Sequence, residues 1–491
     1  MSEDFVARLS DQERQRYEKL ARLRARGIEP YPLRATRTHS AREALDAFTR
    51  GEEPKGVRLA GRLVALRDMG KLCFAHLQDG SAKIQLMFRR DFVGPDNYAV
   101  LLKEFDLGDF VGVEGDVFKT KTGEITLQVS RFELLGKALS PLPEKWHGLK
   151  DIETRYRQRY LDLLSSEEVR RTFVIRAKAV TALRRYLDEH GFLEVETPVL
   201  QPLYGGAAAE PFITHHNKLD RDLYLRIADE LYLKRLLVGG IERVYEISKD
   251  FRNEGIDHRH NPEFTMMECY QAYADYTTMM TLVEEAYCAC AQAAVGSLQL
   301  TYQGHLVDLT PPWKRLTMRD LIFDTSGVDI YQYTDLAGLR ARIQELSLKV
   351  AAQPTWGKTV DELFSTFGEP TLIQPTFLMD YPVELSPFAK KKPDKPRVVE
   401  RFEAFAGTME LGNAFTELND PVDQYERFVE QAAQRQAGDR EAHQIDLDFI
   451  EALMHGMPPT GGLGMGIDRM TMLLSDQVSI REVILFPQLR T

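Results

Sequence analysis

The chain has few cysteines and no long hydrophobic run. Its 491 residues include only four cysteines, at Cys73, Cys269, Cys288 and Cys290. The Cys288-Ala-Cys290 pair lacks the second ligand cluster that a structural zinc site needs. Scattered cysteines suit a reducing compartment, which predicts a cytoplasmic protein. No stretch approaches the ~20 apolar residues of a membrane span, and the N-terminus lacks the apolar core of a signal peptide, so we expect no membrane association.

The chain also has fewer basic than acidic residues. There are 63 Lys and Arg residues against 74 Asp and Glu residues, so the net charge is −11. This balance argues against a general nucleic-acid binder, and a nucleic-acid partner would need local basic patches. Residues 10–27 supply one such patch, on an amphipathic helix expected to end at Gly27. A solvated, salt-bridged helix face is the commoner explanation of this pattern.

Residues 56–136 contain five strand candidates separated by Gly and Asp-Gly, with a helical segment near Tyr98–Phe105 between the third and fourth. This order predicts an OB-fold, a small barrel that often binds single-stranded nucleic acid. Such barrels stack unpaired bases on aromatic rings and read base edges with polar side chains. Phe74, Gln85 and Arg67, the last placed in a loop, are the candidates. A core position for Phe74 is equally compatible with the pattern.

The segment from Val244 to Tyr276 predicts a hairpin with strands over 244–254 and 263–272. Alternate residues of a strand share a face. One face therefore carries the following side chains: Asp250, Arg252 and Glu254 on the first strand, and Phe264, Met266, Glu268 and Tyr270 on the second. A cation, carboxylates, a ring and a phenol suit a polyanion that bears an aromatic base. An edge hairpin with a solvated charged face is the alternative.

A second segment, GGLGMGIDRMTMLL at 461–474, predicts a glycine-rich turn that leads into a helix carrying Arg469. Glycines allow close approach of a ligand to the backbone. The segment is not a Rossmann fingerprint, because Ile467 takes the place of the third glycine. The chain has no P-loop around Lys358 either, because Ala352 stands where the first glycine would be.

Three segments resemble, in order, the motifs of class II aminoacyl-tRNA synthetases. HGFLEVETPVL at 190–200 resembles motif 1, which is associated with the dimer interface, FRNEG…HNPEF resembles motif 2 and GLGMGIDRM resembles motif 3. The segments GGAAAEPFITHHN and LGNAFTELNDP are similar in sequence to segments of the bacterial-type lysyl-tRNA synthetase family. The resemblance covers essentially the whole chain. One departure is Glu210, where similar enzymes usually carry a basic residue.

The resemblance implies an α+β fold with a helical extension over 1–55, an OB-fold anticodon-binding domain over 56–145 and a catalytic domain over 146–491. The catalytic domain would be an antiparallel sheet flanked by helices. The implied activity is ATP-dependent: lysine and ATP give lysyl-adenylate and pyrophosphate, and lysine then passes to the 3′ end of tRNA(Lys). The enzyme would be a homodimer, with Phe74 stacking on the central uridine of the anticodon and Gln85 reading it.

Activation needs no enzyme nucleophile, because the substrate carboxylate attacks the α-phosphate in line, so the protein must position the reactants and stabilise charge. Arg252 suits a bridge between carboxylate and α-phosphate through its planar fork of donors, and Arg469 resembles the γ-phosphate ligand. The implied ATP contacts are Arg252, Glu254, His260, Phe264 and Arg469. The implied lysine contacts are Gly206, Glu230, Arg252, Tyr270, Asn413, Phe415 and Glu417.

Magnesium takes oxygen ligands, usually one or two carboxylates plus phosphates. Glu403 and Glu410 match the family's metal-binding glutamates, although strand parity places Glu410 opposite Asn413. A bulge at Gly412 would bring these side chains to one face.

Substrate choice depends on charge at the distal end of the pocket. Glu417 resembles the carboxylate that binds the ε-ammonium of lysine, and Glu230 the one that holds the α-ammonium. An aspartate pocket would instead need a cation at the distal end. Three alternatives stay open: aspartate or asparagine specificity, lysine transfer to a protein, and a non-catalytic tRNA-binding homologue. Protein-modifying paralogues lack an OB-domain, and loss of Arg252 or Arg469 would have indicated the non-catalytic homologue.

Overall fold

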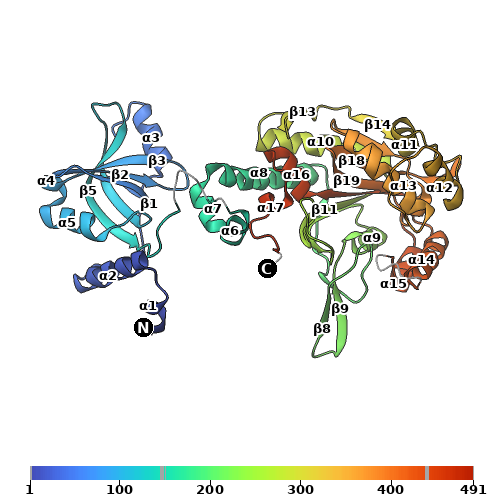
Figure 1. Cartoon of the computed structure of the whole chain (residues 1–491), viewed down its shortest axis with the longest axis horizontal. Coiled ribbons are helices and arrows are strands. Elements are labelled where there is room, and N and C mark those ends of the chain that lie inside the picture. Colours follow the sequence, from blue (N-terminus) through green and yellow to red (C-terminus); the bar gives the residue numbers. More distant parts are fainter. Residues whose placement is uncertain (1–2, 144–148, 150, 437–441, 490–491) are drawn as a thin grey trace. The chain divides into compact units, whose positions relative to one another are not determined.

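The structure is a computed structural model that describes residues 3–143, 149, 151–436 and 442–489. The chain divides into two compact units, Met1–Gly148 and Leu149–Thr491. Figure 1 shows the elements of each unit. In the described ranges no helix is both long and apolar enough to cross a membrane.

The N-terminal unit is a closed barrel with strands in the order β1-β2-β3-β5-β4 and helices beside it (Figure 1). Its strands are β1 Val57–Asp68, β2 Leu72–Gln78, β3 Lys83–Arg89, β4 Phe110–Lys119 and β5 Ile125–Gly136. Its helices are α1 Glu3–Ala7, α2 Asp11–Ala25, α3 Ala41–Thr49, α4 Arg90–Val93 and α5 Pro95–Glu104. The predicted OB-fold is confirmed.

Alternation along β2 decides which side chains fill the barrel. Cys73, Ala75 and Leu77 are buried in its core, whereas Phe74 lies on the outer face and is partly exposed. The predicted loop position of Arg67 was wrong: β1 continues to Asp68, so Arg67 belongs to a strand and pairs in register with Phe74. The loop prediction failed because charged residues at the end of a strand resemble a turn in sequence.

The basic N-terminal helix is α2, which begins with a capping box formed by Ser10 and Glu13. Part of its positive charge holds it to the barrel. Arg16 donates to three backbone carbonyls, Lys19 pairs with Asp106 at 2.7 Å, and Arg22 pairs with Glu104 at 3.0 Å. These side chains therefore have a structural function.

The C-terminal unit is built on one large sheet with the order β14-β15-β18-β19-β20-β11-β10-β6 (Figure 1). Its strands are β6 Leu193–Glu194, β10 Arg243–Phe251, β11 Glu263–Ala272, β14 Lys314–Thr317, β15 Thr376–Met379, β18 Arg401–Ala406, β19 Met409–Thr416 and β20 Thr460–Gly466. Neighbouring strands are antiparallel except at the two edges, where β6 runs parallel to β10 and β14 to β15. The smaller sheets are formed by β7 Leu200–Gln201, β8 Ile213–His216 and β9 Arg221–Leu225, by β12 Gln299–Tyr302 and β13 His305–Asp308, and by β16 Lys391–Lys392 and β17 Lys395–Val399.

Helices α8, α10 and α16 pack with the central strands around the main apolar core of this unit (Figure 1). The helices of the unit are α6 Ile152–Arg157, α7 Arg159–Ser165, α8 Glu167–Glu189, α9 Glu230–Val238, α10 Tyr276–Ala294, α11 Met318–Ser326, α12 Leu336–Glu345, α13 Trp356–Leu363, α14 Pro421–Gln436, α15 Leu447–Met454, α16 Ile467–Ser475 and α17 Ile480–Val483. Shorter helical turns are η1 Phe364–Gly368, η2 Glu369–Thr371 and η3 Val383–Leu385.

Two strand predictions needed correction. The strand expected to reach Glu254 ends at Phe251, so Arg252 and Glu254 lie in the following loop. The glycine segment at 461–466 is not a turn but the central strand β20, paired with β11 and β19. Glycine has low β-propensity and no side chain to show alternation, so the sequence pattern of a strand is missing there.

Candidate active site

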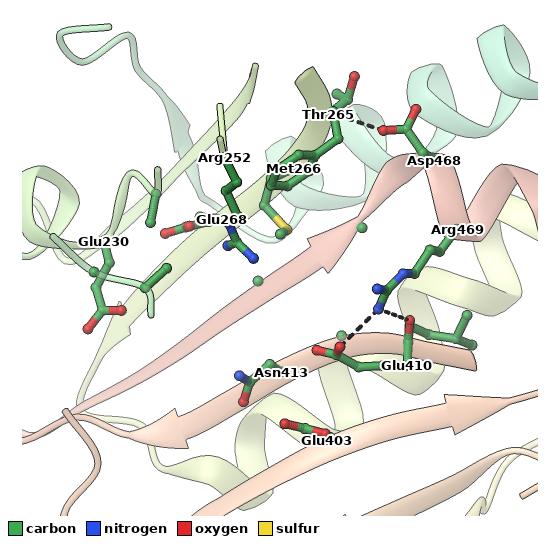
Figure 2. Close-up of a pocket in the computed structure, with 18 of the residues that line it drawn as sticks. Glu230, Arg252, Thr265, Met266, Glu268, Glu403, Glu410, Asn413, Asp468 and Arg469 are labelled. Carbon is green, nitrogen blue, oxygen red and sulfur yellow. Dashed lines mark hydrogen bonds and ion pairs between the residues drawn. The ribbon is translucent and has the colours of Figure 1, made fainter. Parts of the chain in front are cut away.

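A cavity of about 350 Å³ opens along the central strands of the C-terminal unit. Every residue that the sequence assigned to ATP, lysine or magnesium lines it. These residues are Gly206, Glu230, Arg252, Glu254, His260, Phe264, Tyr270, Glu403, Glu410, Asn413, Phe415, Glu417 and Arg469. Figure 2 shows Glu230 at one end and Arg469 at the other. The fold thus brings residues from five parts of the chain into one site.

Strand β20 forms one wall of the cavity, and its glycines make room there. Gly462 pairs with Tyr270 on β11 and Phe415 on β19, and Gly464 pairs with Glu268 and Asn413. A Cβ atom on Gly462 would lie 1.8 Å from Glu417 Oε1 and 2.5 Å from the Tyr270 ring. Only glycine fits there without moving these two side chains.

Two arginines line the cavity: Arg469 marks its cation end, and Arg252 lies between Arg469 and Glu230 (Figure 2). Arg252 Cζ lies 5.0 Å from the centroid of the Phe264 ring, and Arg252 Nε donates to the Ile227 carbonyl at 3.4 Å. Arg469 donates to Glu410 Oε2 at 2.9 Å (Figure 2). A planar guanidinium beside an aromatic ring can contact both a phosphate and a stacked base.

His260 lies beside Arg469, with its Nε2 atom 3.4 Å from Arg469 Nη2. Its Nδ1 atom is 2.8 Å from Asp257 Oδ2. Partial burial alone would raise the pKa of Asp257, but hydrogen bonds from His260 and from the Arg259 backbone lower it to about 2. The ionised Asp257 fixes the ring orientation, and Nε2 therefore faces the cavity end that holds Arg469.

The other end carries carboxylates. Glu230 on α9 and Glu417 after β19 are both buried, and both pair with the buried ammonium of Lys234, Glu230 at 2.5 Å. Glu268 accepts a hydrogen bond from the Tyr270 hydroxyl at 3.0 Å. Glu417 Oε1 has no hydrogen-bond partner in the described part of the chain.

Burial raises the pKa of Glu417 well above its ordinary value, and Lys234 opposes that shift. Burial likewise raises the pKa of Glu230 and of Glu268, the latter with further help from nearby carboxylates. Burial would lower the pKa of Lys234, but Glu230 and Glu417 raise it, so this ammonium stays charged. This end of the cavity is therefore acidic and short of positive charge.

Glu403 and Glu410 lie on neighbouring strands, and the expected bulge is present. Ala404 pairs with Gly412 but Phe405 pairs with Glu410, so Leu411 is the extra residue of β19. The bulge brings Glu410 to the face that carries Asn413 (Figure 2). The predicted position, Gly412, is one residue away.

These two carboxylates fit a magnesium ion that is shared with phosphates. Burial and the charge of Glu410 raise the pKa of Glu403 to about 7, a repulsion that a divalent cation would relieve. Each glutamate also pairs with an arginine, Glu403 with Arg401 at 2.6 Å and Glu410 with Arg469 at 2.9 Å. No cluster of three or more metal-ligating side chains occurs among the described residues, so the protein alone does not form a complete magnesium site.

Asp250 does not line the cavity, although the hairpin prediction placed it on the same face as Arg252. It is fully buried in a cluster around Arg226, which pairs with Glu246 at 2.6 Å and Asp229 at 3.1 Å. Burial, with the charge of Asp250, raises the pKa of Asp229 to about 8, and burial raises that of Asp250 to about 6. Arg226 Nε also donates to the Lys249 carbonyl at 2.9 Å, so this cluster supports β10 from behind.

The remaining predicted residues differ in how tightly they are held. Asn413 Oδ1 accepts from Arg401 Nε at 3.0 Å, and the Phe415 ring lies 5.4 Å from Lys234 Nζ. Gly206 has φ +90°, which favours glycine. Glu210, which stands where similar enzymes usually carry a basic residue, is held through its backbone: its carbonyl accepts a hydrogen bond from Asn253 N at 2.7 Å.

Sequence reasoning gave no role to Lys234 or to Glu268. Glu268 was placed on the correct face of the hairpin, and its position beside Tyr270 was the available signal. Lys234 follows Glu230 by one helical turn, so the pairing of these two side chains could have been predicted from the sequence. Its second partner, Glu417, is distant in the chain and could be found only in the structure.

On the barrel of the N-terminal unit, Phe74 and Gln85 lie on neighbouring strands of the outer face. The Gln85 amide is held in one orientation, because Oε1 accepts from Thr126 at 2.7 Å and Nε2 donates to Glu124 at 2.7 Å. One N–H and one lone pair of the amide remain for a ligand. A uracil edge offers a complementary acceptor and donor.

Comparison with known proteins assigns both units. Residues 57–135 match the OB-fold nucleic acid binding domain, and residues 151–490 match the tRNA synthetases class II (D, K and N). The chain is 56% identical to a lysine–tRNA ligase of Roseiflexus sp. over 487 residues, covering 98% of this chain and 99% of the relative. It is 56% identical to the lysine–tRNA ligase of Chloroflexus aurantiacus, covering 98% and 99%, and 51% identical to that of Bacillus subtilis, covering 98% of each chain.

The motifs, the cavity that they line and the match over most of the chain agree. This chain belongs to the class II aminoacyl-tRNA synthetases of the D, K and N group.

Proposed function

We propose that the chain is a lysine–tRNA ligase, which activates L-lysine with ATP and transfers it to the 3′ end of tRNA(Lys). The observation that carries the substrate assignment is the acidic end of the cavity. Glu417 is 1% exposed and Glu230 5%, and Glu417 Oε1 lacks a hydrogen-bond partner within the described residues. A terminal ammonium would satisfy that oxygen, whereas a substrate carboxylate would be repelled. The relatives named above carry the same activity in their names.

Aspartate specificity would need a free cation at that end. A cation does lie there, Lys234, but Glu230 and Glu417 already neutralise it, and Lys234 is not among the described residues that line the cavity. An acidic side chain would be repelled by Glu417, and an amide could donate a hydrogen bond to Oε1 but would leave the charge of the carboxylate uncompensated. The charge arrangement therefore supports lysine over aspartate or asparagine.

The proposed reaction places lysine and ATP along β20. Gly462, beside Glu417, and Gly466, beside Arg469, are four residues apart, which is about 13 Å along a strand. Glu230 and the Gly206 carbonyl would hold the α-ammonium, with Asn413, Phe415 and Tyr270 around the side chain. Arg252 would then hold the carboxylate against the α-phosphate, in line for attack.

At the cation end, Arg469 and His260 would bind the terminal phosphates, Phe264 would stack on adenine, and Glu254 would contact the base. Arg469 would have to exchange Glu410 for phosphate, since the two are paired in the structure at 2.9 Å. Glu403 and Glu410 would then hold magnesium together with phosphate oxygens. When bound, the ion would offset the negative charge of the triphosphate.

For tRNA recognition, we infer that Phe74 stacks on an anticodon base while Gln85 reads its edge, and that Arg67, level with Phe74, contacts the backbone. The support is the outward position of Phe74 and the fixed amide of Gln85. Stacking on an exposed ring is the usual mode of base binding on OB-folds.

We further infer a homodimer in the cytoplasm. Apolar side chains of the motif 1 region are exposed on the single chain, with Leu193 at 54%, Leu200 at 48% and Val199 at 39% exposure. Apolar side chains left exposed in a segment that resembles motif 1 are what a protein–protein interface would cover. The four cysteines are unpaired, as suits a reducing compartment.

The test is amino-acid-dependent ATP–pyrophosphate exchange with lysine, aspartate and asparagine, with magnesium present and tRNA absent. We expect exchange with lysine alone. Exchange with aspartate or asparagine would keep the family and overturn the substrate assignment. Absence of exchange with all three would indicate a non-catalytic homologue.

A further inference from the structure

Lys234 is the most deeply buried ammonium group near the cavity, with a fully buried side chain. It lies on α9, one turn after Glu230, and pairs with Glu230 Oε1 at 2.5 Å and with Glu417 Oε2. Its Nζ atom lies 5.1 Å from the centroid of the Phe388 ring and 5.4 Å from that of Phe415. No described residue other than these two glutamates forms an ion pair with it.

Both partners of Lys234 line the cavity, whereas Lys234 lies behind them. Two carboxylates buried close together cannot both stay ionised without a cation between them. A buried ammonium is equally unfavourable unless it is paired on more than one side. Lys234 and its two glutamates therefore form one unit whose charges depend on each other.

The geometry also divides the oxygens of these carboxylates. Lys234 takes Oε1 of Glu230 and Oε2 of Glu417. Glu417 Oε1 lies against Gly462 and the Tyr270 ring and has no hydrogen-bond partner among the residues that the structure describes. The single charge of Lys234 thus balances one of the two carboxylate charges of Glu230 and Glu417. One negative charge remains at this end of the cavity.

We propose that Lys234 is a positioning and specificity-determining residue: it orients Glu230 and Glu417 and leaves the charge of one carboxylate for the terminal ammonium of the substrate. This inference rests on the proposed lysine activation. An acidic side chain meets surplus negative charge, and a neutral amide can donate a hydrogen bond to Glu417 Oε1 but leaves the charge of that carboxylate uncompensated. Only a cationic side chain both pairs with this oxygen and balances the charge.

Removal of the Lys234 charge should therefore alter how lysine binding depends on pH. The charged groups that act on Lys234 are Glu230 and Glu417; Arg401 acts in turn on Glu230, and both glutamates act on Tyr270, which also interacts with Glu268. Without the ammonium, the two glutamates hold protons to higher pH, and lysine must displace them. The penalty on lysine binding should then be largest at low pH and shrink as the pH rises.

The experiment compares wild type with Lys234→Met and Lys234→Gln in lysine-dependent ATP–pyrophosphate exchange between pH 6.5 and 9. Exposed Lys349→Met is the matched control. We expect the KM for lysine to rise at least about tenfold at pH 7 for both Lys234 variants. The KM for ATP should change by less than about threefold. The ratio of variant to wild-type lysine KM should fall as the pH rises.

A second measurement supplies the missing group from solution. In Lys234→Ala, n-propylammonium replaces the atoms that the substitution removes, and propan-1-ol is its neutral control. The ammonium should lower the lysine KM of this variant, and the alcohol should not. Wild type treated with either compound shows any competition at the substrate site.

The outcomes separate this inference from the proposed function. If wild type fails to exchange with lysine, the proposed function is wrong and this inference falls with it. If wild type exchanges and the variants keep its lysine KM, or show a ratio that is constant with pH, Lys234 has no positioning function. KM does not depend on the fraction of folded enzyme, so partial misfolding leaves the readout valid. Failure of all variants to fold would assign Lys234 to folding and overturn the inference.

Discussion

Substitution of Glu417 by glutamine tests the substrate pocket most directly. The change keeps the shape of the side chain and removes its charge. Glu417 is 1% exposed, and its Oε1 atom is unpartnered within the described residues, so the substrate ammonium would meet it away from water. Loss of one partner of a buried, hydrogen-bonded charge pair costs about 2–4 kcal/mol. That range corresponds to a rise of about 30- to 1000-fold in the KM for lysine.

ATP should be almost unaffected by this change. The cation end of the cavity lies about 13 Å along β20 from Glu417, and among the described residues Glu417 forms an ion pair with Lys234 but not with Arg252 or Arg469. The assay is ATP–pyrophosphate exchange with lysine or ATP varied in turn. Exposed Glu451→Gln on α15 is the control. Comparable losses for lysine and ATP, or a lysine KM within about threefold of wild type, would refute the pocket assignment.

Three further changes test other parts of the structure. Phe74→Ala should leave ATP–pyrophosphate exchange unchanged but raise the KM for tRNA about 5- to 150-fold in aminoacylation, since stacking contributes about 1–3 kcal/mol per base. Exposed Phe92→Ala is the control, and equal losses in both assays would mean that Phe74 has a structural role. Gly462→Ala should reduce lysine-dependent exchange at least about 100-fold, because its Cβ would lie 1.8 Å from Glu417 Oε1. The control Gly80→Ala, whose Cβ would meet nothing within 4 Å, should not reduce exchange. Near-normal exchange in Gly462→Ala would contradict the close packing of Gly462 against Glu417. Burial and neighbouring carboxylates raise the pKa of Asp229 to about 8, above its ordinary value, so its contribution to stability is complete below about pH 4 and is lost as the pH rises through 8. The fall in Tm between pH 6 and 9, measured by calorimetry, should therefore be smaller in Asp229→Asn than in wild type, and an unchanged fall would mean that Asp229 is ionised throughout.

Several elements could be predicted from local sequence. The second hairpin strand was predicted over Glu263–Ala272, which are its bounds in the structure, because a charged loop containing Asn and Pro precedes it. The bulge beside Gly412 was inferred because Glu410 had to share a face with Asn413 although strand parity put them on opposite faces. In both cases local chemistry constrained local geometry.

Other features depended on long-range contacts or on missing side chains. Glycines gave β20 no alternation, so a central strand was read as a turn. Asp250 shared the parity of Arg252 but became part of the buried Arg226 cluster, because β10 ends between them. The pairing of Lys234 with Glu417 joins distant segments, and no local pattern predicts it.

The placement of Glu230 and Lys234 on one helix has a consequence for how this specificity could change. The two residues are four positions apart on α9, so their pairing is fixed by helix geometry rather than by loops. Loss of Lys234 alone leaves two buried carboxylates without a cation, and loss of either glutamate leaves Lys234 with one partner instead of two. A shift toward another amino acid would therefore require coordinated substitutions on α9 and after β19. Single substitutions would weaken lysine binding without forming a pocket for another amino acid, so the proposed lysine pocket is separated from related specificities by weakly active intermediates.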